Sequence, residues 1–164
     1  APGGLMHASA RYTNAERSLM AWLQAGGIDV VPEDATRANS DDATSFVRVS
    51  MEPGPEEVSG HRTAGYHAAR VPLQVRCQCF ARGADSVSGA VDAASQLADT
   101  VADRLRLATV PILDYLADPT GATSTGERLQ CSTYPSRTPL PPTEGWARRQ
   151  VSALFFWFLR TEEA

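Results

Sequence analysis

The stretch QVSALFFWFLRTEE, Gln150–Glu163, decides the fold of this chain. It contains seven consecutive apolar residues, Ala153–Leu159, beside a charged tail. In a strand, alternate residues point to opposite faces, and one face here is apolar throughout: Val151, Ala153, Phe155, Trp157 and Leu159. The other face begins polar with Gln150 and Ser152, then becomes apolar at Leu154, Phe156 and Phe158. Half of the strand is therefore apolar on both sides, and helices can cover only one side.

Two interpretations account for the second apolar side. Loops of the same subunit can fold over it, for example the Pro-rich segment with Trp146, because monomers rarely expose apolar patches above a few hundred Å². Alternatively, another subunit covers it. Three large apolar side chains removed from water contribute roughly 1.5–3 kcal/mol each, which is enough to matter for assembly.

Composition indicates one globular domain, residues 1–164, with 43% hydrophobic and 21% charged residues. All 15 basic residues are arginine, which excludes a phosphate-loop lysine or a lysine Schiff base. The formal charge is -4, and the arginines are scattered along the chain, so no basic nucleic-acid patch is visible. The apolar run is far shorter than the ~20 residues that span a bilayer, and we expect no membrane partner.

The three cysteines are Cys77, Cys79 and Cys131. An odd count, with no secretion pattern in the first residues, favours reduced thiols in a cytosolic compartment. His61, His67, Cys77 and Cys79 could be drawn as a zinc site. Because the two cysteines alternate in phase with apolar residues of one strand, we interpret them as core residues and expect no metal.

No local catalytic motif is recognisable, although a Ser–His–Asp triad stays open because its members come from distant positions. There is no G-x-S-x-G elbow and no G-x-G-x-x-G loop. Asp99 and Asp103 are one helical turn apart, and we interpret them as a solvated helix face. We therefore expect no catalytic residue and no cofactor, and we predict that the protein is not an enzyme.

Periodicity predicts two helices. The first covers residues 14–25, with Thr13 as N-cap and Glu16 completing a capping box, and the second covers about 86–107. Residues 1–12 are predicted to be a flexible N-terminal segment, and the acidic residues 32–45 a mobile loop.

Alternation predicts four strands, at residues 46–52, 71–80, 128–134 and about 148–160. A Pro-rich connector, residues 135–146, is expected before the last one. The first two strands are joined by 18 residues, which form either an arm with its tip near Gly60–Gly65 or a mobile segment. The element order predicts an α+β fold: a largely antiparallel four-stranded sheet with two helices packed on one face and a long hairpin loop or arm.

With these elements placed, the chain resembles the tail-terminator and tail-completion (neck) proteins of long-tailed phages. The resemblance covers about residues 14–160, and its segments in chain order are ERSLMAWLQAGG, FVRVSMEPG, GYHAAR, VPLQVRCQCFARG, DAASQLADTVADRL and LQCSTYP. The Pro-rich insert and the loop after the second helix are longer here than in that family.

The resemblance implies a hexameric ring that caps the tail tube, stops its polymerisation and offers a joining surface to the head connector or stopper protein. DNA would pass through the lumen without specific binding. The location implied is the virion neck, with assembly in the host cytoplasm. The expected subunit contacts are Leu154, Phe156 and Phe158 on the last strand, with His61 and Tyr66 on the arm. Alternatives are a head–tail connector, a tail-tube component, or a small α+β enzyme or ligand-binding domain.

Overall fold

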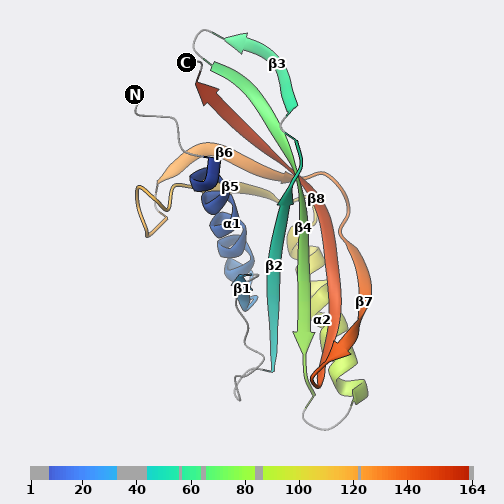
Figure 1. The fold of residues 1–164 in the computed structure, drawn as a ribbon. Coiled ribbons are helices and arrows are strands. Elements are labelled where there is room, and N and C mark those ends of the chain that lie inside the picture. Colours follow the sequence, from blue (N-terminus) through green and yellow to red (C-terminus); the bar gives the residue numbers. More distant parts are fainter. Residues whose placement is uncertain are drawn as a thin grey trace.

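The computed structural model describes residues 8–32, 44–55, 57–63, 66–83, 87–121 and 123–162. Within these ranges the chain forms two helices and eight strands (Figure 1). In chain order they are α1 (Ala8–Ala25), β1 (Val30–Pro32), β2 (Ser45–Pro53), β3 (Glu57–Thr63), β4 (Tyr66–Ala81), α2 (Val87–Leu105), β5 (Thr109–Leu113), β6 (Ser124–Cys131), β7 (Ser136–Thr143) and β8 (Trp146–Glu162).

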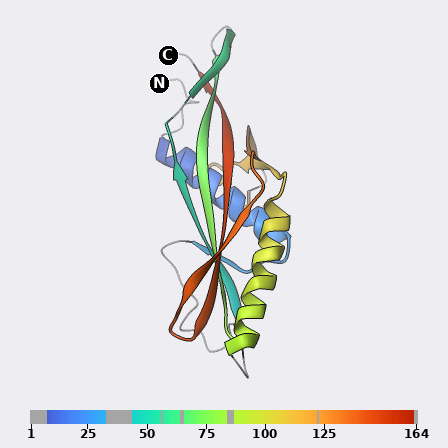
Figure 2. The ribbon, with the colours of Figure 1, turned by 90° about the vertical axis from the view of Figure 1, so that its right-hand side faces the viewer.

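The centre of the sheet is the antiparallel pair β4 and β8, which stay in register from Tyr66↔Glu162 to Ala81↔Ala147. Strands β2 and β3 follow one another along the far side of β4, while β7 and β6 share the far side of β8. The sheet is completed by β1, parallel to β2, and by β5, antiparallel to β6. The eight described strands thus form one mixed sheet, which curls strongly (Figure 2).

The α+β class is correct, but the prediction of a four-stranded, largely antiparallel sheet is wrong. The physical reason for the difference is the length of the central strand pair, β4 and β8. At 16 and 17 residues, β4 and β8 far exceed the usual strand length of about 5–6 residues. No single neighbour of ordinary length can satisfy their backbone groups, so shorter strands are arranged in tandem along each side.

Three predicted segments differ from the structure. The expected connector 135–146 contains β7, which pairs with β8 despite its prolines. Helix α1 begins at Ala8, so Thr13 lies inside it and only residues 1–7 of the expected flexible segment fall outside the description. Of the expected loop 32–45, Pro32 ends β1 and Ser45 begins β2, and residues 33–43 lie outside the described ranges.

The long connection between β2 and β4 forms a hairpin. Strand β3 pairs with the first part of β4, from Glu57↔Arg70 to Thr63↔Tyr66, and the end of β8 lies on the other side of β4. The three strands project beyond the helices (Figure 1). This projection, the arm, consists of β3 with the paired ends of β4 and β8.

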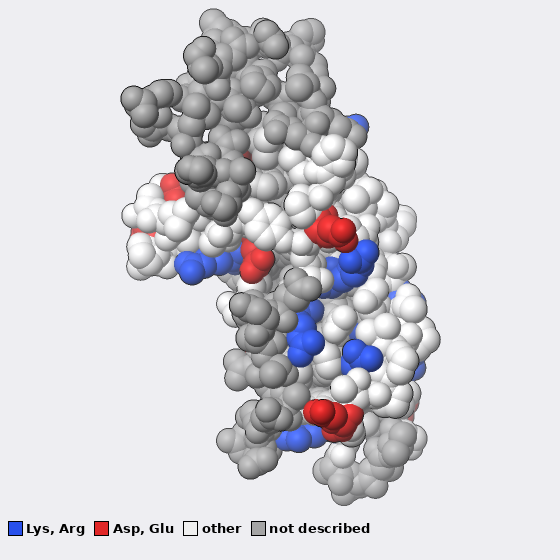
Figure 3. Space-filling view, viewed as in Figure 1, with Lys and Arg blue, Asp and Glu red and all other residues white. Residues whose placement is uncertain are grey.

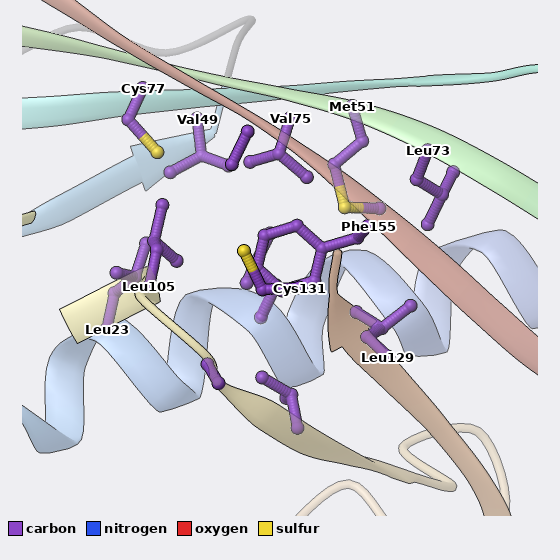
Figure 4. Close-up of a cluster of buried hydrophobic side chains, with 14 of the residues drawn as sticks. Leu23, Val49, Met51, Leu73, Val75, Cys77, Leu105, Leu129, Cys131 and Phe155 are labelled. Atoms are coloured by element: carbon purple, nitrogen blue, oxygen red, sulfur yellow. The ribbon is translucent and has the colours of Figure 1, made fainter. Parts of the chain in front are cut away.

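Both helices pack on the same side of the sheet and enclose one core. Leu19 and Leu23 of α1 and Leu105 of α2 are fully buried against Leu73 and Phe155 of the central strands (Figure 4). Alanines dominate the buried stripe of α2 at positions 90, 94 and 98, which lets that helix approach the sheet closely. We call this helix-covered side the inner face and the opposite side the outer face.

Polar contacts fix α1 against its neighbours. The Trp22 indole N–H donates to the Arg104 carbonyl at 3.2 Å, and Arg104 Nε donates back to the Trp22 carbonyl at 2.9 Å. Buried Asn14 and Ser18 accept backbone N–H bonds from Tyr115 and Leu113, each at 2.9 Å. Because these buried polar groups are paired, the helix layer is held in one position relative to the sheet.

Candidate interaction surface

The outer face of β8 carries the residues predicted to contact another subunit. Leu154, Phe156 and Phe158 are half-buried, while Phe155 and Trp157 between them are 0% and 5% exposed on the inner face. The inner apolar set is thus sequestered by the helices, and the outer set is not sequestered to the same extent. We call Leu154, Phe156 and Phe158 the apolar triplet.

Two arginines lie over the aromatic rings of the apolar triplet. The Arg70 guanidinium is 4.5 Å from the Phe156 ring centroid, and that of Arg128 is 4.6 Å from Phe158. The two phenylalanine rings lie 6.4 Å apart. Such cation–π contacts place a positive charge directly over each aromatic ring of the triplet.

Strand pairing brings these arginines together. Arg70 on β4 and Arg128 on β6 are both Cα partners of Phe158, although they are far apart in the sequence. In the sequence these arginines look scattered, and their position over the apolar triplet was not predicted. The only usable signal, their parity relative to the aromatic residues, requires knowledge of the strand register.

Leu154 lies where the neighbour of β8 changes from β7 to β6. The backbone N–H of Ser132 donates to the Leu154 carbonyl at 2.9 Å, and the Ser132 hydroxyl does so at 3.1 Å. In return, the Leu154 N–H donates to the Thr133 hydroxyl at 3.1 Å. These bonds satisfy the β8 backbone at the gap and hold the apolar triplet on a continuous strand.

The opposite end of the outer face has a different arrangement. Phe46 and Phe80 stack at 4.6 Å, and Trp146 meets Phe46 edge-on at 5.2 Å. With Val31 they form a separate buried cluster, in which each residue is at most 6% exposed. Trp146 of the same chain therefore covers Phe46 and Phe80 at this end. Among the described residues, this cluster does not include the apolar triplet.

His61 and Tyr66 lie on the arm, as predicted. Tyr66 is the Cα partner of both Thr63 and Glu162, and His61 falls in the irregular part of β3 between Val58 and Arg62. The side chains of both residues lie outside the described part of the chain. Their assignment to a subunit interface stays a prediction.

The predicted core role of the cysteines agrees with their burial. Cys77 and Cys79 are 0% exposed and belong to the inner-face core (Figure 4). Burial raises the pKa of Cys79 to about 12 and that of Cys77 further, so both are neutral thiols near pH 7. Among the described residues, no group of three or more His, Cys, Asp or Glu could hold a metal ion.

The remaining candidates for chemistry lie on the surface. Asp99 and Asp103 are exposed on α2, and Asp99 forms an ion pair with Arg137 of β7. A groove of about 370 Å³ separates the start of α2 from the β7–β8 hairpin, with walls that include Ala90, Leu140 and Trp146. Neither location combines a nucleophile with a base.

Comparison with known proteins supports the fold alone. No family model matches this chain, and neither does any curated protein. Several solved chains match, and one of them has a TM-score of 0.55 and 15% sequence identity over 97% of this chain and 100% of the other. The class that fold and surface define is therefore an α+β domain built on a curled mixed sheet. No described helix is long and apolar enough to cross a membrane.

Proposed function

We propose that this chain is a structural subunit of a phage neck, forming a ring, expected to be a hexamer, that caps the tail tube. The ring would stop tube polymerisation and offer the joining surface to the head connector, with DNA passing through its lumen. The observation that carries the proposal is the apolar triplet, Leu154, Phe156 and Phe158, half-buried on the outer face of a strand whose inner face is fully packed.

Energetics support association through this surface. Complete burial of a large apolar side chain contributes about 1.5–3 kcal/mol, and each member of the triplet retains part of that contribution for a partner. The projecting arm adds a second surface of different shape. A ring requires two different surfaces that meet across each contact; the triplet is one of them, and the arm is a further expected contact.

Native mass spectrometry together with negative-stain electron microscopy tests the proposal. A single closed ring, with six copies expected, supports a terminator. Open-ended stacks would favour a tail-tube component, and a monomer with no tendency to associate would contradict the proposal and favour the enzyme or ligand-binding alternative. Addition of tube protein sharpens the test, because a terminator should stop tube growth.

A double substitution ties the ring to the proposed surface. Phe156→Ser with Phe158→Ser should dissociate the ring while the monomer stays folded. The matched control is Phe155→Ser, which falls between them on the inner face and should unfold the chain. Unfolding of the double variant as a monomer would show that the pair belongs to the core, and the interface assignment would then fail.

A further inference from the structure

The charge of the molecule is divided unequally between the outer face and the rest of the chain. Among the described residues, the charged residues at outer-face register positions are six arginines and three glutamates: Arg48, Arg70, Arg76, Arg128, Arg148, Arg160, Glu52, Glu57 and Glu162. Six positive charges less three negative charges give +3. Because the whole chain carries -4, all residues outside this set carry -7 together.

Figure 3 shows basic patches spread along this side of the molecule, with acidic patches and uncharged atoms between them. Arg76 forms an ion pair with Glu52 at 3.1 Å, and Arg48 lies 5.0 Å from the Phe80 ring. Arginine and aromatic residues, which both occur on the outer face, are enriched in protein–protein interfaces.

We infer that the outer face docks against the helix side of a second copy of this chain, with its arginines meeting carboxylates on α2. This inference rests on the proposed ring and names the two surfaces that meet in it. Two copies of the outer face would oppose +3 to +3, so a symmetric face-to-face dimer is disfavoured. Contact between the basic outer face and a different, acidic surface is attractive and can close into a ring.

Helix α2 supplies the acidic surface. Asp92, Asp99 and Asp103 are exposed on α2, away from its buried alanine stripe, and α2 lies on the opposite side of the sheet from the outer face (Figure 2). Asp99 already pairs with Arg137, which leaves Asp92 and Asp103 to meet the neighbour. These two are about 16 Å apart along the helix axis. Arg76 and Arg128 lie about 20 Å apart along the strands, a comparable spacing.

A nucleic acid is the other partner that a basic, aromatic sheet face could take. Proteins that bind single strands on such faces stack bases on open aromatic rings. Here Arg70 and Arg128 already occupy the rings of Phe156 and Phe158, while Phe46 and Phe80 are buried. The structure therefore favours an acidic protein surface over nucleic acid.

Charge reversal on each surface separately tests the inference. One variant carries Arg70→Glu with Arg128→Glu, and the other carries Asp92→Arg with Asp103→Arg. By native mass spectrometry and sedimentation, each should be monomeric at concentrations where the unmodified chain is fully assembled. Mixed together, they should assemble again with the two variants alternating, because each contact then joins an acidic surface to a basic one. A chain with all four substitutions should assemble again.

A matched control distinguishes the effect of the position from the effect of reversing an arginine charge anywhere on the surface. Arg17 is exposed on α1 and lies 6.0 Å from the Tyr115 ring, on neither the outer face nor α2, so Arg17→Glu should leave assembly unchanged. Circular dichroism checks that each variant folds. If the glutamate pair unfolds, Arg70→Gln with Arg128→Gln replaces it and should still weaken assembly.

Three outcomes would contradict the inference, and the experiment distinguishes them. Wild-type assembly by either double variant would overturn the inference and leave the ring intact as a proposal. A monomeric unmodified chain would overturn both. Binding of duplex DNA that is lost with Arg70→Glu and Arg128→Glu, while assembly persists, would assign the face to nucleic acid and also overturn the inference.

Discussion

The two ends of the outer face carry similar aromatic residues on the same pair of strands, yet they are built differently. At one end, Phe46, Phe80 and Trp146 cover one another and are between 1% and 4% exposed. At the other, Phe156 and Phe158 are half-buried beneath two arginines. Because the first end is completed by its own chain, its aromatic residues stabilise the monomer. The second end keeps part of its apolar area exposed, and the proposed neighbouring subunit would cover it.

Truncation at the two ends should produce the largest difference. Phe46→Ala leaves a cavity in a closed cluster and should lower the free energy of unfolding by about 3–5 kcal/mol. Phe158→Ala removes a half-buried ring and should lower it by about 1 kcal/mol in the monomer. Urea denaturation at concentrations below assembly measures both. Equal losses would show that the open end is as much part of the monomer core as the closed one.

The inner face should respond to pH where the outer face does not. Burial raises the pKa values of Cys77 and Cys79 above the ordinary 9.0, to about 12 for Cys79. Above pH 9 the unfolded thiols ionise while the folded ones stay neutral, so stability is complete below pH 9 and falls as pH rises. The loss approaches about 1.4 kcal/mol per thiol at pH 10.

Thermal unfolding of the unmodified chain and of Cys79→Ala across this pH range measures the effect. The variant should be less stable throughout because of its cavity, but its stability should fall less steeply above pH 9. Parallel curves for the two proteins would contradict the assignment of the slope to this thiol.

The parts of the fold with clean periodicity could be predicted from the sequence. The α2 stripe, the alternation in residues 46–52 and 71–80, and the final strand all correspond to observed elements. The parity of β8 also places the apolar triplet opposite the buried set. The strand count failed, because β1, β3, β5 and β7 were not predicted. Strand β7 was missed because it carries Pro139, Pro141 and Pro142, residues that normally argue against a strand.

The arginines over the apolar triplet could not be predicted. Arg70 and Arg128 meet Phe158 only through the register of β4 and β6 on β8, and register depends on contacts distant in sequence. The same applies to the closed end, where Val31 and Trp146 reach Phe46 from separate strands. The sequence therefore predicts which side of a strand is apolar, but not what covers that side.

The turn that positions Trp146 provides a third test of the closed end. Glu144 and Gly145 have φ angles of 50° and 83°, as required at both central positions of a type I′ hairpin turn. Gly145→Ala places a Cβ in the left-handed region and should cost about 1–2 kcal/mol of stability. Glu144→Asn should have the opposite sign, since asparagine tolerates that region better. Thermal unfolding measures both, and a loss with Glu144→Asn would contradict the turn assignment.

The smallest expected effect concerns the arginine over the open end. A double-mutant cycle with Arg128→Ala and Phe158→Leu should give a coupling of about 0.5–1 kcal/mol in the monomer, the usual value for an exposed cation–π pair. Arg17, whose guanidinium lies 6.0 Å from the Tyr115 ring, supplies a more distant pair for comparison and should couple more weakly. A coupling well above this range would mean that Arg128 is bound too strongly to the Phe158 side chain to contact a partner. A small coupling means that its guanidinium can turn toward a partner's carboxylate at little cost, as docking of a second copy requires.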